Sequence, residues 1–362
     1  MVSSIRVVYD GWPLIREKAS PAALHLLAIL AHLPEGVSPL VALPEDAPAW
    51  FPESIKTQVA AHPNTEFARS NWEQRVLPRL ARQADADLLH VVVPRGSLLG
   101  NQKTLISPSG FAQENDFDSR FGIRLREALG TGGLARANGL LWPSDLKEPQ
   151  DNTRIFKLPP TVHPDFQPAS EPVPPSIKGL DLPENYVLYH GPTNAAALRR
   201  LLSAWTWGAG SIGEYYPLLL LGLNAGPRAY IENLLPSFNL TGFVQVLSEI
   251  APTDIPALYR GSSAVYHLGE TSAWGGSLRH ALACTRPIAG LQAPLADAIA
   301  GQAAYLVDGD ERSLGSAFIA VVIKEAVYEN LIAAARERTR GWQSSDYGGY
   351  LLNVYKAVLE IS

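Results

Sequence analysis

Residues 259–290 read YRGSSAVYHLGETSAWGGSLRHALACTRPIAG, and the assignment of the fold rests first on this stretch. The short apolar run at 264–268 suits a buried β-strand, and a loop with paired glycines at 275–276 follows it. From Ser277 onward the apolar spacing predicts a helix with Ser277 as its N-cap, ended by Thr285–Pro287. The pattern therefore predicts a strand, a glycine-bearing loop and a helix that packs back on a parallel sheet.

Two readings of this stretch are open on the residues alone. A helix N-terminus beside a glycine loop, at the carboxyl edge of a parallel sheet, binds anions readily because its first N–H groups lack partners within the helix. The same pattern fits an ordinary β–α–β crossover in which the glycines serve only the turn, since short glycine motifs are unspecific.

The stretch resembles the signature segment of retaining GT-B glycosyltransferases, in particular the large family 4 group. In that family a strand leads to Glu, Gly, an aromatic residue and Gly, and the next helix ends in Ala-Met-Ala-Cys-Gly-Thr-Pro. This chain has Ser272-Ala-Trp-Gly-Gly276, then His280-Ala-Leu-Ala-Cys-Thr-Arg-Pro287. The family's paired glutamates, eight positions apart, fall here on Ser272 and His280.

The resemblance covers nearly the whole chain. It implies an α/β GT-B fold, with two Rossmann-like doubly wound domains that face each other across a cleft. We expect an acceptor-side domain at 1–166 and a nucleotide-sugar donor domain at 181–340. Four prolines between 167 and 178 predict a semi-rigid linker, which we place at 167–180. Residues 341–362 are expected to form a last helix that crosses back to the first domain.

Composition restricts the class of protein. The 362 residues suffice for two domains, and 46% hydrophobic with 18% charged residues describes a packed chain rather than a disordered one. The net charge of −5 and the lack of a basic run argue against a nucleic-acid partner. A single cysteine, Cys284, excludes an internal disulfide and a cysteine-based zinc site.

The same sequence predicts a cytoplasmic protein. No apolar stretch reaches the ~18 residues that a spanning helix needs, and residues 1–5 have no signal-peptide character. Peripheral contact with a membrane stays open.

The first domain opens with a β-rich run at Ile5–Tyr9, a loop, and a helix start at Ser20-Pro21. In the resembling family this loop lies near the donor phosphates, so Arg16 and Lys18 are candidate phosphate contacts. The alternative reading is that they are ordinary solvated cations.

The family's acceptor-side His-Asp pair is expected just after residues 104–108. This chain has Ser107-Pro-Ser-Gly110 there, without the histidine. The polar loop Gln113–Gly122 either covers an acceptor cleft or is a plain connection.

The second domain opens with a strand at Tyr186–His190, then Gly191, Thr193, Asn194 and a helix. In the resembling family this glycine and helix N-terminus face the donor diphosphate, which an Arg and a Lys from the loop hold. Here the loop and helix are present, but the cations are not. Thr193 and Asn194 would give neutral hydrogen bonds, which are weaker than charge-assisted ones.

The residues expected to bind the donor are Gly191, Thr193, Asn194, Ser272, Trp274, Gly275, Gly276, Ser277, Leu278 and His280. The catalytic group is unassigned, with two candidates. Glu270 stands two positions before the family's first glutamate, although it is equally well an exposed loop carboxylate. His280 both donates and accepts hydrogen bonds, so it can contact a ribose where the family has Glu.

The resemblance thus implies a retaining hexosyltransferase that moves a sugar from a nucleotide-sugar, UDP- or GDP-linked, to a sugar or glycan acceptor. It implies no metal and no bound cofactor. The glutamates, the loop cations and the acceptor-side histidine are absent together, and preorganised charge usually supplies most of the catalysis. The alternative is therefore a catalytically inactive GT-B module that binds a sugar, a nucleotide or a partner transferase.

Overall fold

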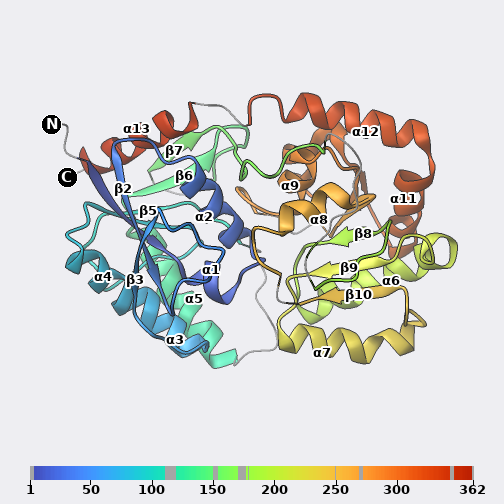
Figure 1. Cartoon of the computed structure of the whole chain (residues 1–362), viewed down its shortest axis with the longest axis horizontal. Helices are drawn as coiled ribbons and strands as arrows, with labels where there is room; N and C mark the ends of the chain where they lie inside the picture. The colour runs from blue at the N-terminus through green and yellow to red at the C-terminus, as the bar shows by residue number, and fades with distance from the viewer. Residues whose placement is uncertain are drawn as a thin grey trace. The chain divides into compact units, whose positions relative to one another are not determined.

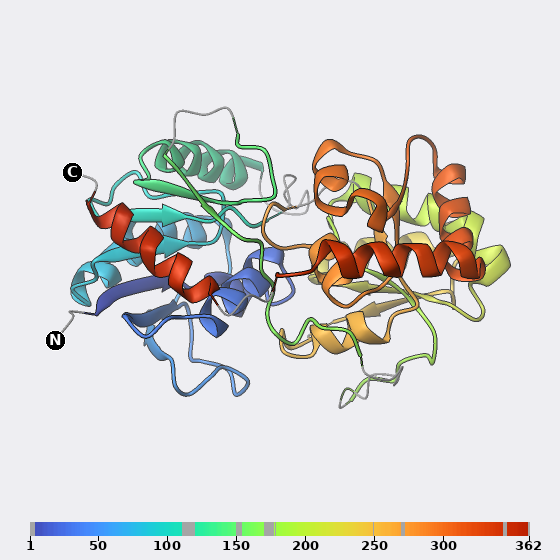
Figure 2. The same ribbon diagram turned by 90° about the horizontal axis from the view of Figure 1, so that it is seen from above.

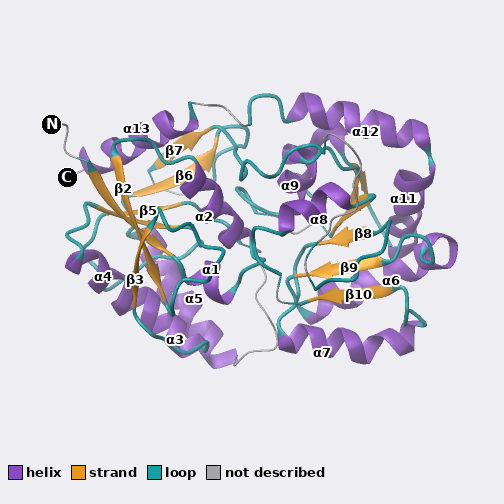
Figure 3. Cartoon of the chain, viewed as in Figure 1, coloured by secondary structure: helices purple, strands orange, loops and turns teal. Residues whose placement is uncertain are grey.

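The structure is a computed structural model that describes residues 4–110, 120–149, 154–169, 177, 179–248, 250–268, 272–342 and 346–360. The chain forms two compact units. Among the described residues, unit 1 runs to His163 and resumes at Trp342, and unit 2 is Pro164–Gly341. Each unit contains one parallel sheet with helices packed on it, drawn in orange and purple in Figure 3.

The sheet of unit 1 has seven strands in the order β3-β2-β1-β4-β5-β6-β7 (Figure 1). They are β1 (Ile5–Asp10), β2 (Val37–Leu43), β3 (Lys56–Val59), β4 (Leu88–Val91), β5 (Thr104–Ile106), β6 (Gly139–Pro143) and β7 (Ile155–Leu158). All four residues of β4 are buried, as expected for a parallel strand covered on both faces.

The helices of unit 1 are α1 (Trp12–Arg16), α2 (Pro21–Ala31), α3 (Glu66–Asn71), the π-helical turn η1 (Trp72–Val76), α4 (Leu77–Gln83), α5 (Arg120–Ala135) and α13 (Tyr347–Glu360). Helix α2 starts as predicted, because the Ser20 hydroxyl accepts the Ala23 N–H at 3.1 Å. The helix that contains Trp72 begins at Glu66, because the Thr65 hydroxyl caps it by accepting the Ala68 N–H.

Helix α13, the last red helix in Figure 2, lies on the sheet of unit 1. The hydroxyl of Tyr355 is 3.0 Å from that of Tyr9 on β1 and 2.8 Å from His90 Nδ1 on β4. Burial lowers the pKa of His90 to about 3, so its ring is neutral at pH 7. This histidine therefore has a structural role, since it joins α13 to the sheet.

The sheet of unit 2 has six parallel strands in the order β10-β9-β8-β11-β12-β13. They are β8 (Val187–Tyr189), β9 (Leu218–Leu221), β10 (Val244–Leu247), β11 (Ala264–His267), β12 (Ile288–Leu291) and β13 (Tyr305–Val307). Residue Ala264 pairs with Val187 and Val265 with Ile288, so β11 lies between β8 and β12.

The helices of unit 2 are α6 (Ala195–Ile212), α7 (Ala225–Leu234), η2 (Leu235–Phe238), α8 (Ile255–Gly261), α9 (Ser277–Ala283), α10 (Pro294–Ala300), η3 (Gly301–Ala303), α11 (Glu311–Ile323) and α12 (Glu325–Arg338). The core under α6 and α11 is built on aromatic contacts: the ring of Tyr266 is 3.7 Å from that of Phe318, which also meets Trp205 edge-on.

Candidate functional site

The candidate donor site lies where the strand order of unit 2 reverses. The chain leaves β8 toward β9 on one side and leaves β11 toward β12 on the other, although β8 and β11 are neighbours. Loops that leave such a switch point diverge at the carboxyl edge of a parallel sheet and open a crevice there. The two loops are residues 190–194 and residues 268–276, the two that the sequence singles out.

The first loop joins β8 to α6. A side chain at Gly191 would meet the ring of Tyr189 at 2.8 Å, and the Tyr189 hydroxyl donates to the Pro192 carbonyl at 2.6 Å. Asn194 is buried and caps α6, because its Oδ1 accepts the Ala197 N–H at 2.9 Å. Thr193 is half-buried. The loop is thus tightly folded and contains no Asp, Glu, Lys or Arg.

The second loop follows β11, and its described part, Ser272–Gly276, is buried throughout. The Gly275 N–H donates to the Ser272 hydroxyl at 3.3 Å. Gly276 has φ +102°, a conformation that favours glycine, and it is the N-cap of α9. The sequence prediction that Ser277 is the N-cap is wrong, because the Ser277 hydroxyl is bonded to His267 Nδ1 at 3.0 Å instead.

His267, at the end of β11, is a site residue that sequence reasoning missed. Burial lowers the pKa of His267 to about 4, so the imidazole is neutral at pH 7. Nδ1 contacts Ser277, whereas Nε2 has no hydrogen-bond partner in the described part of the chain. A buried nitrogen without a partner costs about 1–3 kcal/mol, and a ligand hydroxyl or a water can supply that partner.

Arg279 is a second residue that the sequence did not reveal. Its side chain is fully buried, and its Nε donates to the Ala273 carbonyl at 2.8 Å. The bond ties the second loop to the first turn of α9. All seven residues of α9 are buried, so the helix has no polar stripe from which periodicity can predict the direction of Arg279.

His280 lies one turn into α9, inside a cluster of rings. Its imidazole stacks on Phe166 with centroids 4.1 Å apart, lies parallel to His190 at 6.4 Å, and meets Tyr259 edge-on at 5.5 Å. Only 2% of His280 is exposed. The ring is thus enclosed and leaves little surface for a ribose to contact.

The remaining expected donor residues are packed beneath the loop or lie outside the description. Trp274 and Leu278 are completely buried. Glu270, one of the two catalytic candidates, lies outside the described residues, as does most of the polar loop 113–122.

At the corresponding edge of unit 1, Asp10 ends β1. Its Oδ1 accepts the Trp12 N–H at 3.1 Å and the Trp72 Nε1–H at 2.9 Å. Burial raises the pKa of Asp10, and the bond from Trp72 only partly offsets this. The buried carboxyl group therefore holds the start of α1 and the π-helical turn η1 at the end of β1.

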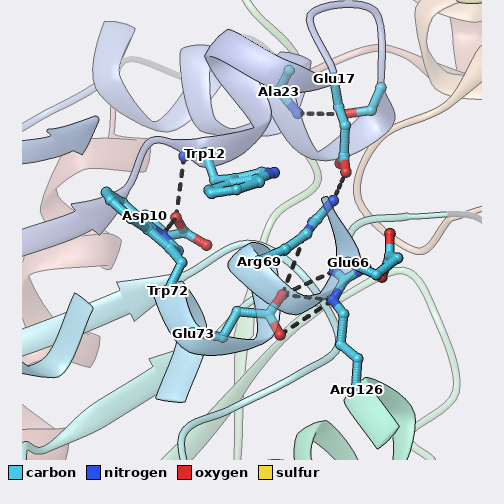
Figure 4. A network of polar contacts seen from close by, with 10 residues as sticks. Asp10, Trp12, Glu17, Ala23, Glu66, Arg69, Trp72, Glu73 and Arg126 are labelled. Carbon is cyan, nitrogen blue, oxygen red and sulfur yellow. Dashed lines mark hydrogen bonds and ion pairs between the residues drawn. The ribbon is translucent and has the colours of Figure 1, made fainter. Parts of the chain in front are cut away.

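Beside Asp10 lies a buried ion cluster, shown in Figure 4. Arg126 on α5 donates to Glu73 at 2.9 Å and to Glu66 at 3.2 Å, and Arg69 pairs with Glu73 and with Glu17. Burial would raise the pKa of Glu73, but the charges of Arg126 and Arg69 outweigh it and hold that pKa below its ordinary value. Burial lowers the pKa of Arg69 to about 9.

Arg16 and Lys18, the candidate phosphate contacts of unit 1, differ in how far their side chains are already engaged. Arg16 pairs with Glu45 at 2.8 Å and donates to the His62 carbonyl at 2.8 Å, so its guanidinium is engaged inside the unit. Lys18 is half-buried. Among the residues that the structure describes, no group of His, Cys, Asp and Glu side chains is arranged to hold a metal ion. None of the described helices is long and apolar enough to cross a membrane.

No protein-family model matches the sequence, and no curated protein matches it. Solved structures match along the whole chain. Sucrose-phosphate synthase from Thermosynechococcus elongatus has a TM-score of 0.66 at 15% identity, covering 99% of this chain and 100% of that one. HepE of Anabaena, solved in complex with UDP-glucose, has a TM-score of 0.66 at 13% identity, covering 98% and 100%.

WaaG, a glycosyltransferase involved in lipopolysaccharide biosynthesis, has a TM-score of 0.66 at 15% identity, covering 98% of this chain and 99% of its own. These neighbours have the GT-B fold, so the fold expected from the signature stretch is confirmed. At such identities the likeness establishes the fold, and function must be argued from the site.

Proposed function

We propose that this protein transfers a sugar from a nucleotide-sugar donor to a sugar or glycan acceptor. The observation that carries the proposal is that the loop of residues 190–194 and the loop that ends at Gly276 leave the neighbouring strands β8 and β11 at the switch point of the sheet. Likeness over the full length to HepE, which was solved with UDP-glucose, supports a nucleotide-sugar as the donor. The donor is a UDP- or GDP-sugar, and it is a co-substrate rather than a resident cofactor.

The proposed donor contacts come from both loops. Gly191, Thr193 and Asn194 precede α6, and Gly275, Gly276 and Ser277 precede or begin α9. Backbone N–H groups at helix starts complement the negative charge of a diphosphate. The other expected donor residues, Ser272, Trp274, Leu278 and His280, are buried in the loop and in α9.

His267 adds a polar group to this site. Its Nδ1 is fixed by Ser277, and its neutral Nε2 is buried at the carboxyl end of β11 without a partner among the described residues. A hydroxyl of the donor sugar is a suitable partner for this nitrogen. Arg16 and Lys18 of unit 1 stay proposed phosphate contacts, although the ion pair with Glu45 weakens the case for Arg16.

A second candidate function, a non-catalytic binding module, is favoured by one observation. The described part of the second loop is buried at every position, and Trp274 is completely covered. A donor therefore has to displace part of this loop before it reaches the start of α9. A module of this kind would bind a nucleotide, a sugar or a partner transferase without turnover.

An assay of donor cleavage separates the two candidates. The purified protein is incubated with UDP-glucose, UDP-N-acetylglucosamine or GDP-mannose, and released nucleoside diphosphate is measured against a heat-unfolded sample. Release of UDP or GDP supports the transferase. Saturable binding without release supports a module that binds nucleotide-sugars. The absence of both binding and release contradicts the transferase and that module, and leaves only a module that binds a partner transferase or a free sugar.

A further inference from the structure

An exposed face of unit 1 combines apolar rings with a row of arginines. Helices α3 and α5 lie side by side there (Figure 1) and are linked by the Glu66–Arg126 ion pair at 3.2 Å. On their outer side Phe67 is 54% exposed, Phe121 69% and Leu125 38%. The two phenyl rings contact each other, with centroids 6.2 Å apart. Large apolar side chains in such contact on a surface usually mark an interaction site.

The continuous helix formed by α3, η1 and α4 carries the charges of this face. Between residues 66 and 83 its exposed positions are Phe67, Asn71, Arg75, Arg79, Arg82 and Gln83. Spacings of three and four residues place these side chains along one side of a helix. In the π-helical turn each backbone hydrogen bond spans one residue more than in an α-helix. The wider turn keeps Arg75 and Arg79 on the same side of the helix as Phe67.

This row is basic on a protein whose formal net charge is −5. Within the described residues, Arg75, Arg79, Arg82 and, on α5, Arg124 form no ion pair. The exposed positions of residues 66–83 include no acidic side chain, although α5 adds the exposed Glu127. The arginines are thus free to attract an anionic partner.

We propose that this face, Phe67, Arg75, Arg79, Phe121, Arg124 and Leu125, binds the surface of an anionic lipid bilayer. Arginines attract the negative headgroups, and phenyl and leucyl side chains insert at the boundary of the acyl chains. An acidic protein would match the charges, but it would leave three large apolar side chains without the apolar phase that they fit. The proposal is independent of the sugar-transfer function.

The test is sedimentation of the full-length protein with vesicles. Vesicles of phosphatidylcholine alone are compared with vesicles that also contain phosphatidylglycerol, at low and high salt. The expected result is binding to the anionic vesicles only, weakened by salt because screening shortens the reach of the arginine charges.

Two double variants and a control locate the contact. R75Q/R79Q is expected to weaken binding about 25-fold, which equals about 2 kcal/mol for two arginines. F67S/F121S is expected to weaken it about tenfold through lost apolar insertion. The control Y215S/R336Q changes an exposed aromatic and an exposed arginine of unit 2 and should bind like the wild type.

The changed side chains of all three variants are exposed, so circular dichroism and the melting temperature should stay unchanged. The proposal is overturned if anionic vesicles do not bind the wild type, if both double variants bind as well as the wild type, or if the control loses binding equally.

Discussion

The imidazole of His280 stacks on the phenyl ring of Phe166, with centroids 4.1 Å apart and an interplanar angle of 18°. His280 is the residue that the family resemblance aligns with a glutamate, whereas Phe166 belongs to the segment with which unit 2 begins. Arg260 donates to the Asp165 carbonyl next to it. The stack therefore fixes the start of unit 2 onto α9, and the buried ring serves packing.

This packing role predicts how His280 responds to substitution. H280F keeps a flat ring of similar size, so it should change the free energy of unfolding by less than about 1.5 kcal/mol and leave nucleotide affinity within about twofold. H280A removes the ring and should destabilise by about 2–4 kcal/mol. Denaturant unfolding and calorimetry measure both effects. A large loss of nucleotide affinity in a stable H280F protein would instead indicate a direct ligand contact.

The end of α9 predicts a stabilising substitution. Thr285 has φ +50°, its N–H donates to the Leu282 carbonyl, and the Arg286 N–H donates to the Ala281 carbonyl. This is the helix-ending motif that glycine fits best, and a β-branched residue is strained in it. T285G should stabilise the protein by about 1 kcal/mol.

The control for T285G is T285A, which removes the β-branch but keeps a Cβ at the same backbone angles, so it should gain less than T285G. Thermal melting compares the two proteins. Equal melting temperatures for T285G and the wild type would mean that the hydrogen bond from the Thr285 hydroxyl to the Cys284 carbonyl offsets the strain.

The buried ion cluster of unit 1 predicts that the free energy of unfolding depends strongly on Glu73. E73Q leaves the buried Arg69 and Arg126 guanidinium groups without their shared carboxylate, and breaking such a pair costs about 3–5 kcal/mol. The matched control is E232Q, which breaks an exposed ion pair with Arg228 and should cost less than about 0.5 kcal/mol. Urea unfolding measures both, and similar losses for the two variants would contradict a buried, interdependent cluster.

The pH dependence of Glu73 has a definite sign. Its pKa in the folded protein is lowered, so its stabilising effect is present above its ordinary pKa and is lost as the pH falls below that value. Wild-type stability should therefore fall on acidification below about pH 4.5 more steeply than that of E73Q.

The pKa of Asp10 is shifted in the opposite direction to that of Glu73, so its effect on stability depends on pH with the opposite sign. Burial raises its pKa in the folded protein, so the stabilisation that it gives at low pH is lost as the pH rises above about 3.9, its ordinary value. D10N keeps an oxygen acceptor for Trp12 and Trp72 and removes the charge. Its stability relative to the wild type should therefore rise with pH through the weakly acidic range, as unfolding at a series of pH values measures.

Comparing D10A with D10N separates the effect of the lost hydrogen bonds on stability from the effect of the lost charge. It leaves the Trp72 indole N–H and the Trp12 amide without their acceptor, so it should lose about 1–3 kcal/mol for each group at every pH. A D10N protein as unstable as D10A at every pH would contradict the expectation that a neutral oxygen acceptor is sufficient at this position.

Much of the fold follows from local sequence patterns. The apolar runs at Val37–Leu43, Ile155–Leu158 and Ala264–Leu268 predict strands that the structure contains at those places. Ser20-Pro21 predicts a helix start because capping and proline preference act locally. The polar edge strand β3 was missed, since Lys56–Val59 has no buried apolar run that would indicate it.

The site was harder to predict, because its geometry depends on contacts between distant segments. The loops of residues 190–194 and 268–276 follow adjacent strands, as a doubly wound sheet requires. Nothing local indicates that Arg279 turns back to the Ala273 carbonyl, or that His267 holds Ser277 and thereby makes Gly276 the N-cap. The π-helical turn likewise follows from the links that Trp72 and Glu73 make to β1 and α5.

The measurement that tests the central claim most directly is calorimetric titration of the full-length protein with UDP, GDP and ADP, each with and without Mg²⁺. A nucleotide-sugar site at the β8–β11 switch point predicts saturable binding at one site per chain for UDP or GDP, with ADP weaker. The absence of measurable binding for all three nucleotides, in a protein shown to be folded, would contradict a donor site in unit 2.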